Sequence, residues 1–305
     1  MRYSQLGLFR PPYPRRPDAE TWRVVCYSGG HSSFLTAVEV SRRFGTDRLI
    51  LLNHDIREDR EMADVKRFKR EGAAYLQVPV VYANYGQNVF AGDKGFVTNE
   101  CPPALDQFEI CEKHSAFKPP VGTEICTSRL KTEPFSKWLE HFFPDKNAVV
   151  YYGFDANEKI RIQRRASAIS EMGYKSGFPL AHWERTILSS RDVGIEPPNT
   201  YACFKHANCV GCLKAGRQHW YVVYVQYRDV FERAKLSEDR IGFSIMKDET
   251  LREVEPLFAR MVSAGIPATE HIGQQRFWAD VRRLGLMSEQ LCDIEVDRKP
   301  CECVF

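Results

Sequence analysis

A turn rich in glycine and serine follows the first apolar run of the chain, between a hydrophobic segment at 22–27 and a helical pattern over 32–44. Its residues are Ser28, Gly29, Gly30, His31, Ser32 and Ser33. Glycine lets an anion approach the backbone, serine hydroxyls add donors, and a helix start offers N–H groups without intrahelical partners. The turn therefore predicts a phosphate or pyrophosphate site. The alternative is an ordinary tight turn with a serine cap.

Three of the ten cysteines fall close together at a C-x5-C-x2-C spacing. They are Cys203, Cys209 and Cys212. Thiolates at this spacing can surround a metal if the loop folds around it, but the site needs a fourth ligand. By spacing alone, zinc, an iron–sulfur cluster and unligated thiols all remain open.

Arginines make up a third chemically suggestive set. Arg161, Arg164 and Arg165 stand at positions i, i+3 and i+4, which share one face of a helix. Guanidinium groups pair well with phosphate or sulfate oxygens. We interpret them as an anion-binding face, with a solvated helix face as the alternative.

A second basic set predicts a solvated helix face, because acidic residues alternate with it between 61 and 71. Its members are Lys66, Arg67, Lys69 and Arg70.

Strands and helices alternate in the segments that carry these residues. Apolar runs predict strands at 22–27, 47–55, 73–81 and 147–154, and helical periodicity predicts helices at 32–44, 57–72, 127–143 and 158–173. This order is typical of an α/β fold, a doubly wound parallel sheet with helices on both faces. Ligands bind such sheets at the carboxyl ends of the strands, where the glycine turn and Asp55 are expected.

Two regions depart from the alternation. Residues 82–122 are rich in Gly, Pro, Asn and aromatic residues and are predicted to be an insertion or lid. From 212 onward the pattern is mostly helical. We expect a nucleotide-binding α/β domain at 20–200 and a cysteine-loop and helical region at 201–305.

The segment SGGHSS resembles the SGGxDS pyrophosphate loop of the adenine nucleotide alpha hydrolase superfamily, the PP-loop ATP pyrophosphatases with a HUP-like fold. Further stretches resemble its PAPS reductase-like branch, and the likeness spans 24–212. They are CTSRLKTEPFSKWL from Cys126, GFDANEKIRIQRR from Gly153, PLAHW from Pro179 and YACFKHANCVGC from Tyr201. Ser32 stands where the superfamily loop has Asp.

The resemblance implies a set of ligands. It implies ATP or a related adenine nucleotide, with the adenosine near Asp55 and the phosphates or activated substrate near Gly153 and the arginines. It further implies a [4Fe-4S] cluster, with Cys126 as the fourth thiolate, and Mg²⁺ as a candidate cofactor. Structural zinc is the alternative to the cluster.

The composition excludes some classes of protein. The formal net charge is +3 over 305 residues, too balanced for a protein that coats nucleic acid through bulk charge. The sequence shows neither an apolar run of membrane length nor a signal-peptide pattern, so we expect a cytoplasmic protein without membrane contact. In that reducing compartment, clustered cysteines favour metal or redox chemistry over disulfides.

Three functions follow. The first is an ATP-dependent sulfur-transfer or thiolation enzyme assisted by an iron–sulfur cluster, with a sulfur donor and an acceptor that a nucleic acid would fit. The second is a PAPS or APS reductase, supplied by a thiol reductant, whose catalytic thiol would be Cys301 or Cys303 in the tail KPCECVF. The third, kept open by Ser32, is an inactive nucleotide-binding module. The acceptor and the oligomeric state stay open.

Overall fold

The computed structural model describes residues 20–57, 60–84, 96–100, 102–207, 209–247 and 249–287. Within them, five parallel strands form a sheet in the order β3-β2-β1-β4-β5. The strands are β1 (Trp22–Cys26), β2 (Leu49–Asn53), β3 (Val80–Tyr82), β4 (Ala148–Tyr151) and β5 (Lys175–Gly177). The strand order changes direction between β1 and β4, and the turns that follow these two strands border a crevice there.

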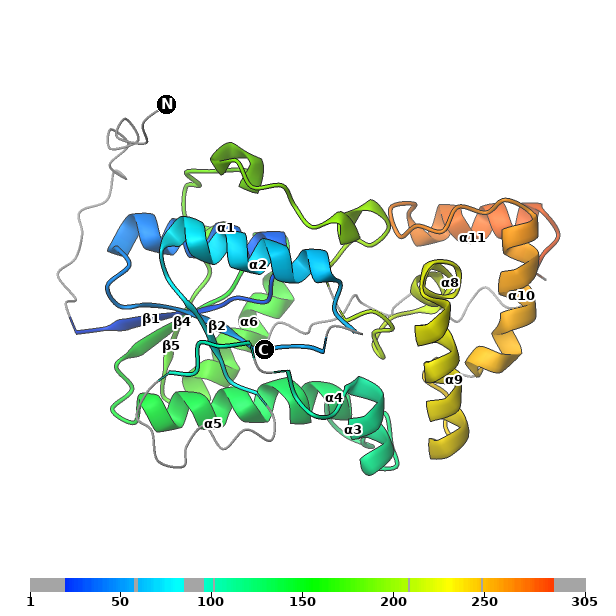
Figure 1. Ribbon diagram of the computed structural model, residues 1–305, viewed down its shortest axis with the longest axis horizontal. Helices are drawn as coiled ribbons and strands as arrows, with labels where there is room; N and C mark the ends of the chain where they lie inside the picture. The colour runs from blue at the N-terminus through cyan, green and yellow to red at the C-terminus, as the bar shows by residue number, and fades with distance from the viewer. Residues whose placement is uncertain are drawn as a thin grey trace.

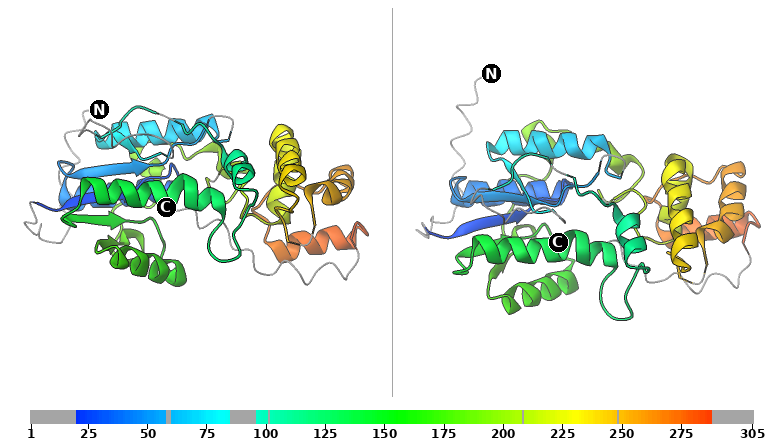
Figure 2. Two further views of the ribbon diagram at one scale, coloured as in Figure 1. Left: turned by 90° about the horizontal axis from the view of Figure 1, so that it is seen from below. Right: turned by 60° about the horizontal axis from the view of Figure 1, so that its bottom comes forward.

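Helices cover both faces of the sheet (Figures 1 and 2). On one face lie α1 (His31–Phe44) and α2 (Ala63–Leu76), and on the other α5 (Glu133–Phe142) and α6 (Lys159–Glu171). Successive residues of a strand point to opposite faces, so Val25 joins the first core and Val24 the second. Strands buried on both faces need continuous apolar runs, which the sequence shows at 24–27 in and after β1 and at 49–52 in β2. The prediction of a parallel sheet flanked by helices is confirmed.

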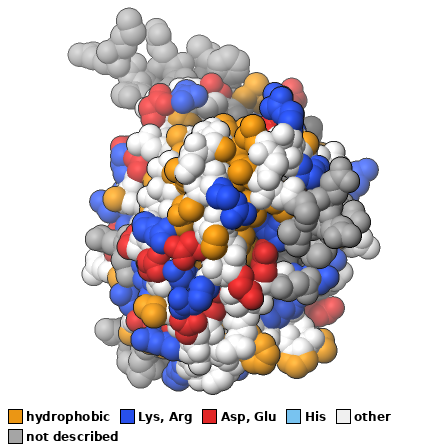
Figure 3. Space-filling view, turned by 90° about the vertical axis from the view of Figure 1, so that its right-hand side faces the viewer, with side chains coloured by type: hydrophobic (Ala, Val, Ile, Leu, Met, Phe, Trp, Pro, Cys, Tyr) orange, Lys and Arg blue, Asp and Glu red, His pale blue; other side chains and the backbone are white. Residues whose placement is uncertain are grey.

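A helical cluster lies beyond one end of the sheet (Figures 1 and 2). It contains α8 (Arg217–Gln226), α9 (Arg228–Ile241), α10 (Leu251–Ser263) and α11 (Gln274–Arg283). These helices share an apolar core that includes Trp220, Phe231 and Phe258. Figure 3 shows the end of the molecule that they form, where acidic, basic and apolar side chains are interspersed.

The predicted insertion contains a helix that belongs to this cluster. α3 (Gln107–Lys113) begins with a capping box between Asp106 and Glu109 and buries Phe108 in the helical core. It is followed by α4 (Ile125–Thr127), a π-helical turn at Ser128–Thr132, and then α5. Residues 107–113 of the predicted insertion are therefore helical. A seven-residue helix shows too few turns of periodicity to stand out from its surroundings.

The predicted set of strands also needs two corrections. Residues 73–76 continue α2, because Ala73 and Leu76 extend its buried face, and the strand begins only at Val80. β5 was not predicted, since its sequence KSG carries no apolar run. The remaining short helices are α7 (Pro179–His182), η3 (Ser190–Val193) and η4 (Asn199–Ala202).

Among the described residues, none of the helices combines the length and apolar composition that a membrane span requires.

Candidate functional site

A cavity of about 720 Å³ opens beside the strand ends at the centre of the sheet. Its walls come from the glycine turn, the segment 153–158 after β4, the segment 189–197 around η3, and the first part of residues 201–212, here called the cysteine loop. Chain segments far apart in sequence therefore converge where parallel sheets place their ligands.

The glycine turn is held in shape by contacts of its own. Gly29 has a positive φ of 84°, and a Cβ there would lie 2.7 Å from Cγ of Lys69, so this position requires glycine. The Ser33 hydroxyl donates to the Gly30 carbonyl at 2.7 Å, and the His31 N–H donates to the Tyr201 hydroxyl at 3.0 Å. The predicted anion-binding turn is thus preformed at the start of α1.

His31 has a second role that its sequence position does not reveal. Its Nε2 accepts a hydrogen bond from the Ser190 N–H at 3.0 Å, which ties η3 to the glycine turn. Burial, together with the charge of Arg191, lowers the pKa of His31 below its usual value. The imidazole therefore serves as a neutral acceptor in the wall of the cavity.

Gly153 brings the loop after β4 against the glycine turn. A Cβ at this position would lie 2.7 Å from the Ser32 carbonyl oxygen and 3.0 Å from the Ser33 nitrogen. Both are backbone atoms at the start of α1, so neither can move without moving the turn. The predicted site residue Gly153 lines the cavity. Only glycine at this position allows the loop after β4 to lie so close to the glycine turn.

We expect Gly153→Ala to destabilise the fold by about 1–3 kcal/mol, because the added methyl group overpacks against the backbone of the glycine turn. Urea unfolding measures the loss of stability. Gly216→Ala is the matched control, since a Cβ at Gly216 meets no atom within 4 Å. Equal behaviour of the two variants would contradict this close approach.

The three predicted arginines do not act as one face. Arg161, in the first turn of α6, lines the cavity, pairs with Glu158, and has its Cζ 4.5 Å from the centre of the Phe154 ring. Arg165 instead lies over Tyr152 at 5.5 Å, and Arg164 is exposed. One further helical turn carries a residue about 5.4 Å along the axis, which separates the later arginines from the cavity.

Basic side chains that the sequence did not point to also line the cavity. The basic residues that line it are Lys131, Arg161, Arg191 and Lys205. The acidic ones, Asp155 and Glu158, pair with Arg185 and Arg161. This excess of positive charge favours an anionic ligand. Lys131 and Lys205 lie within stretches that carry the family resemblance, and that was the signal available for finding them.

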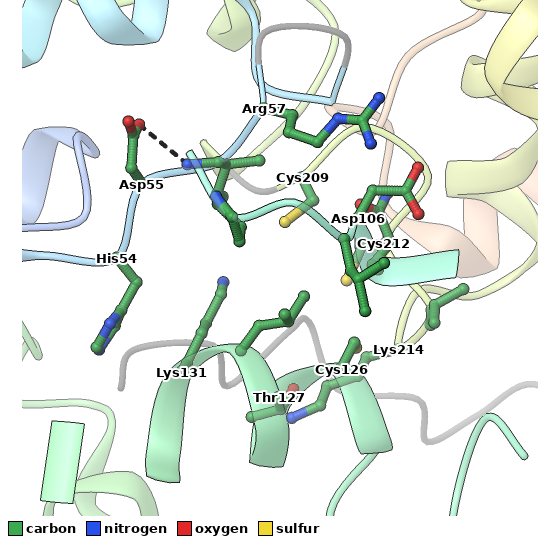
Figure 4. A pocket seen from close by; sticks show the side chains of 16 residues that line it. His54, Asp55, Arg57, Asp106, Cys126, Thr127, Lys131, Cys209, Cys212 and Lys214 are labelled. Atoms are coloured by element: carbon green, nitrogen blue, oxygen red, sulfur yellow. Dashed lines mark hydrogen bonds between the residues drawn. The ribbon is translucent and has the colours of Figure 1, made fainter. Parts of the chain in front are cut away.

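A second, smaller cavity of about 40 Å³ adjoins the first (Figure 4). Cys126, Cys209 and Cys212 line it, together with Lys131, whose side chain points from the π-helical turn into the space between His54 and Cys209. His54, Ile56, Lys131 and Cys209 line both cavities. The thiols therefore lie directly beside the larger cavity.

The turn between Cys209 and Cys212 is rigidly supported. Val210 donates its N–H to the Arg60 carbonyl at 2.9 Å, and its own carbonyl accepts from Nε2 of Gln107 at 2.9 Å. Gly211 has a positive φ of 72°, and a Cβ there would lie 2.7 Å from Cγ1 of Val230. The α3 helix of the predicted insertion thus helps to hold the two thiols in place.

The donor set suits a thiophilic metal. Burial raises the pKa of Cys209, and it raises the pKa of Cys212 to about 12. A hydrogen bond with Cys111, together with burial, raises the pKa of Cys126 well above its ordinary value. These thiols stay protonated without a metal, and a bound cation would favour the thiolates. Within the described chain, however, no three His, Cys, Asp or Glu side chains already stand at metal-binding spacing, so binding would have to draw the thiols together.

One of the four predicted ligands, Cys203, does not line this cavity as the structure describes it. Its side chain packs against the helical core. The predicted catalytic residues Cys301 and Cys303 lie outside the described residues.

Asp55 is engaged in a buried ion-pair network. Its carboxylate accepts from Nζ of Lys66 at 2.9 Å and from the Ile56 N–H at 3.0 Å, and it borders the small cavity (Figure 4). Nζ of Lys69 lies 2.8 Å from Glu61. The prediction that Lys66 and Lys69 belong to a solvated face was wrong, because α2 packs this face onto the sheet with carboxylates inside it. Arg67 and Arg70 are on the outer side, as predicted.

Comparison with known proteins adds one relative. The chain is 27% identical over 210 residues to the uncharacterized nin region protein ORF290 of Escherichia phage lambda, an alignment that covers 64% of this chain and 67% of the phage protein. No family model matches the chain, and no solved structure matches it. The name of the phage protein states no activity.

Proposed function

We propose that this protein is an adenine-nucleotide-binding enzyme of sulfur metabolism, with a doubly wound PP-loop fold, that transfers sulfur in an ATP-dependent reaction assisted by an iron–sulfur cluster. The observation that carries the proposal is the shared wall between the two cavities. A preformed glycine turn and basic side chains border one side, thiols border the other, and Lys131 and Cys209 belong to both.

The residues of the larger cavity have distinct roles in this proposal. The turn at 28–33 cradles the phosphates with N–H groups and hydroxyls, and Arg161 contacts a phosphate oxygen after releasing Glu158. Lys131 neutralises the anionic group that lies nearest the thiols. Asp155 and Glu158 already pair with arginines, so they are weaker ligands for Mg²⁺ than unpaired carboxylates would be.

The thiols of the smaller cavity hold the metal group. Cys126, Cys209 and Cys212 would supply thiolates, with Cys203 as the remaining member of the predicted set of four. A cluster bound there supplies electron transfer or a site for sulfur. Apolar side chains surround the thiols, and Cys212 is buried while Cys126 and Cys209 are partly buried, which limits the access of water to that chemistry.

Removing Arg161 tests the anion site. We expect Arg161→Ala to weaken ATP binding by about 1.5–3 kcal/mol, the value of a hydrogen bond to a charged group. Adenosine affinity should change far less, because adenosine lacks the phosphates. Arg164→Ala, on the exposed side of the same helix, is the control and should leave ATP affinity unchanged. A similar loss in both variants, or for adenosine, would remove Arg161 from the proposed phosphate site.

A PAPS or APS reductase remains the second candidate, favoured by the same adjacency of thiols and an anion-binding cavity. In that reaction a cysteine thiolate attacks the sulfur of PAPS or APS and displaces the adenine nucleotide, which leaves an S-sulfocysteine. A thiol reductant then attacks the cysteine sulfur, forms a disulfide with it and releases sulfite. Incubation of anaerobic protein with ATP plus a sulfur donor, or with PAPS or APS plus a thiol reductant, separates the candidates. Pyrophosphate or AMP release supports the first, and sulfite release supports the second. Nucleotide binding without turnover supports the inactive module.

A further inference from the structure

The segment 269–272, just before α11, forms hydrogen bonds with the cysteine loop. The Glu270 N–H donates to the Cys203 carbonyl at 2.8 Å, and the Glu270 side chain accepts from the Lys205 N–H at 2.9 Å. His271 contacts the Tyr201 carbonyl at 2.7 Å. A part of the helical cluster therefore holds the first half of the loop that separates the two cavities.

The second half of the loop is held through His219 of α8. Nδ1 of His219 lies 2.7 Å from Oε1 of Glu270, and its Nε2 accepts from the Cys212 N–H at 3.4 Å. His219 is buried, with 6% of its surface exposed. Glu270 thus connects Lys205, in the first half of the loop, with Cys212 at its end.

We infer that Glu270 and His219 are positioning residues that set the shape of the cysteine loop and thereby the placement of its thiols. The inference rests on the proposed metal-binding role of those thiols. Neither residue is a ligand or touches the substrate in this assignment. They act through the backbone of Lys205 and Cys212.

The hydrogen-bond directions explain why a carboxylate is needed. Because Nε2 of His219 accepts from Cys212, Nδ1 must carry the proton and donate to Glu270. Glu270 must then accept with both oxygens, one from His219 and one from Lys205. Glutamine can accept with only one end. A glutamine amide that donated to Nδ1 would move the imidazole proton to Nε2, against the Cys212 N–H.

The test compares Glu270→Gln with Glu249→Gln in the full chain, purified anaerobically. Glu249 pairs with Arg217 at the start of α8 and does not contact the cysteine loop in the described structure, so it controls for the general loss of a carboxylate. The readouts are iron and zinc content per chain and the rate of metal release to a chelator. We expect release from Glu270→Gln to be about 10–100-fold faster than from the wild type and from Glu249→Gln. Glu270→Asp, which keeps two acceptor oxygens, should recover part of the difference.

Hydrogen exchange of the metal-free protein provides a second readout. The amides of Lys205 and Cys212 should exchange faster in Glu270→Gln, while the glycine turn keeps its protection and its ATP affinity. Metal release and exchange equal to those of Glu249→Gln would overturn the inference. A wild type without metal would refute the proposed metal site, and the exchange measurement would still decide whether Glu270 holds the loop.

Discussion

Serine substitution at Cys209 or Cys212 is expected to abolish metal binding. Both thiols line the small cavity, and their turn is fixed by Gly211 and by the hydrogen bonds of Val210, so no neighbouring thiol can replace them without rebuilding the turn. Under the [4Fe-4S] assignment, anaerobic wild-type protein should be brown and contain about four iron and four sulfide per chain. The variants should be colourless and contain neither.

Other cysteines provide the controls. Cys26→Ser should retain the metal, because Cys26 lies on β1 within the core that faces α5 and α6. Cys126→Ser should lose it. Cys203→Ser shows whether Cys203 is a ligand: loss of metal supports the predicted set of four thiolates, and retention agrees with the position of Cys203 outside the described lining of the cavity. Colourless anaerobic wild-type protein with one zinc would make the site structural and contradict cluster-assisted chemistry.

Removing the Lys66 ammonium group from the buried network should produce the largest loss of stability. We expect Lys66→Met to lower the free energy of unfolding by about 3–5 kcal/mol, because the Asp55 carboxylate then loses its nearest cation in the protein interior. Lys69 cannot replace it fully, since its Nζ lies 3.8 Å from Asp55 and 2.8 Å from Glu61. Urea unfolding followed by circular dichroism measures the change.

Two further variants show whether the effect arises from the buried charge. Arg70→Met removes a cation from the solvent side of the same helix and should change stability by no more than about 0.5 kcal/mol. The double variant Lys66→Met with Asp55→Asn should recover part of the loss, because it no longer leaves an unpaired buried carboxylate. A loss at Lys66 no greater than that at Arg70 would contradict the structural role of the network.

Local patterns were enough to predict β1, β2 and β4 and the position of the glycine turn. The apolar runs of β1 and β2, the helical spacing after Ser32 and the glycines at 29 and 30 each act within a few residues. Backbone conformation at such places depends on side-chain shape and on burial of the whole segment. The order of strands and helices then placed the turn at the ligand-binding edge, and the spacing of Cys209 and Cys212 predicted that these thiols lie together.

Which charged and thiol side chains meet was decided by packing between distant segments. Lys66 and Arg70 are alike in sequence, yet only Lys66 meets a buried carboxylate, because α2 turns that face toward the sheet. The same applies to Arg161 and Arg164, which one helix directs to different surroundings. Lys131 and Glu270 had no local feature that marked their contacts with the cysteine loop. Lys66 is 11 residues from Asp55 and Glu270 is 65 residues from Lys205, and in each case the partners belong to different segments. Their pairing therefore depends on the assembled fold and not on any pattern within one segment.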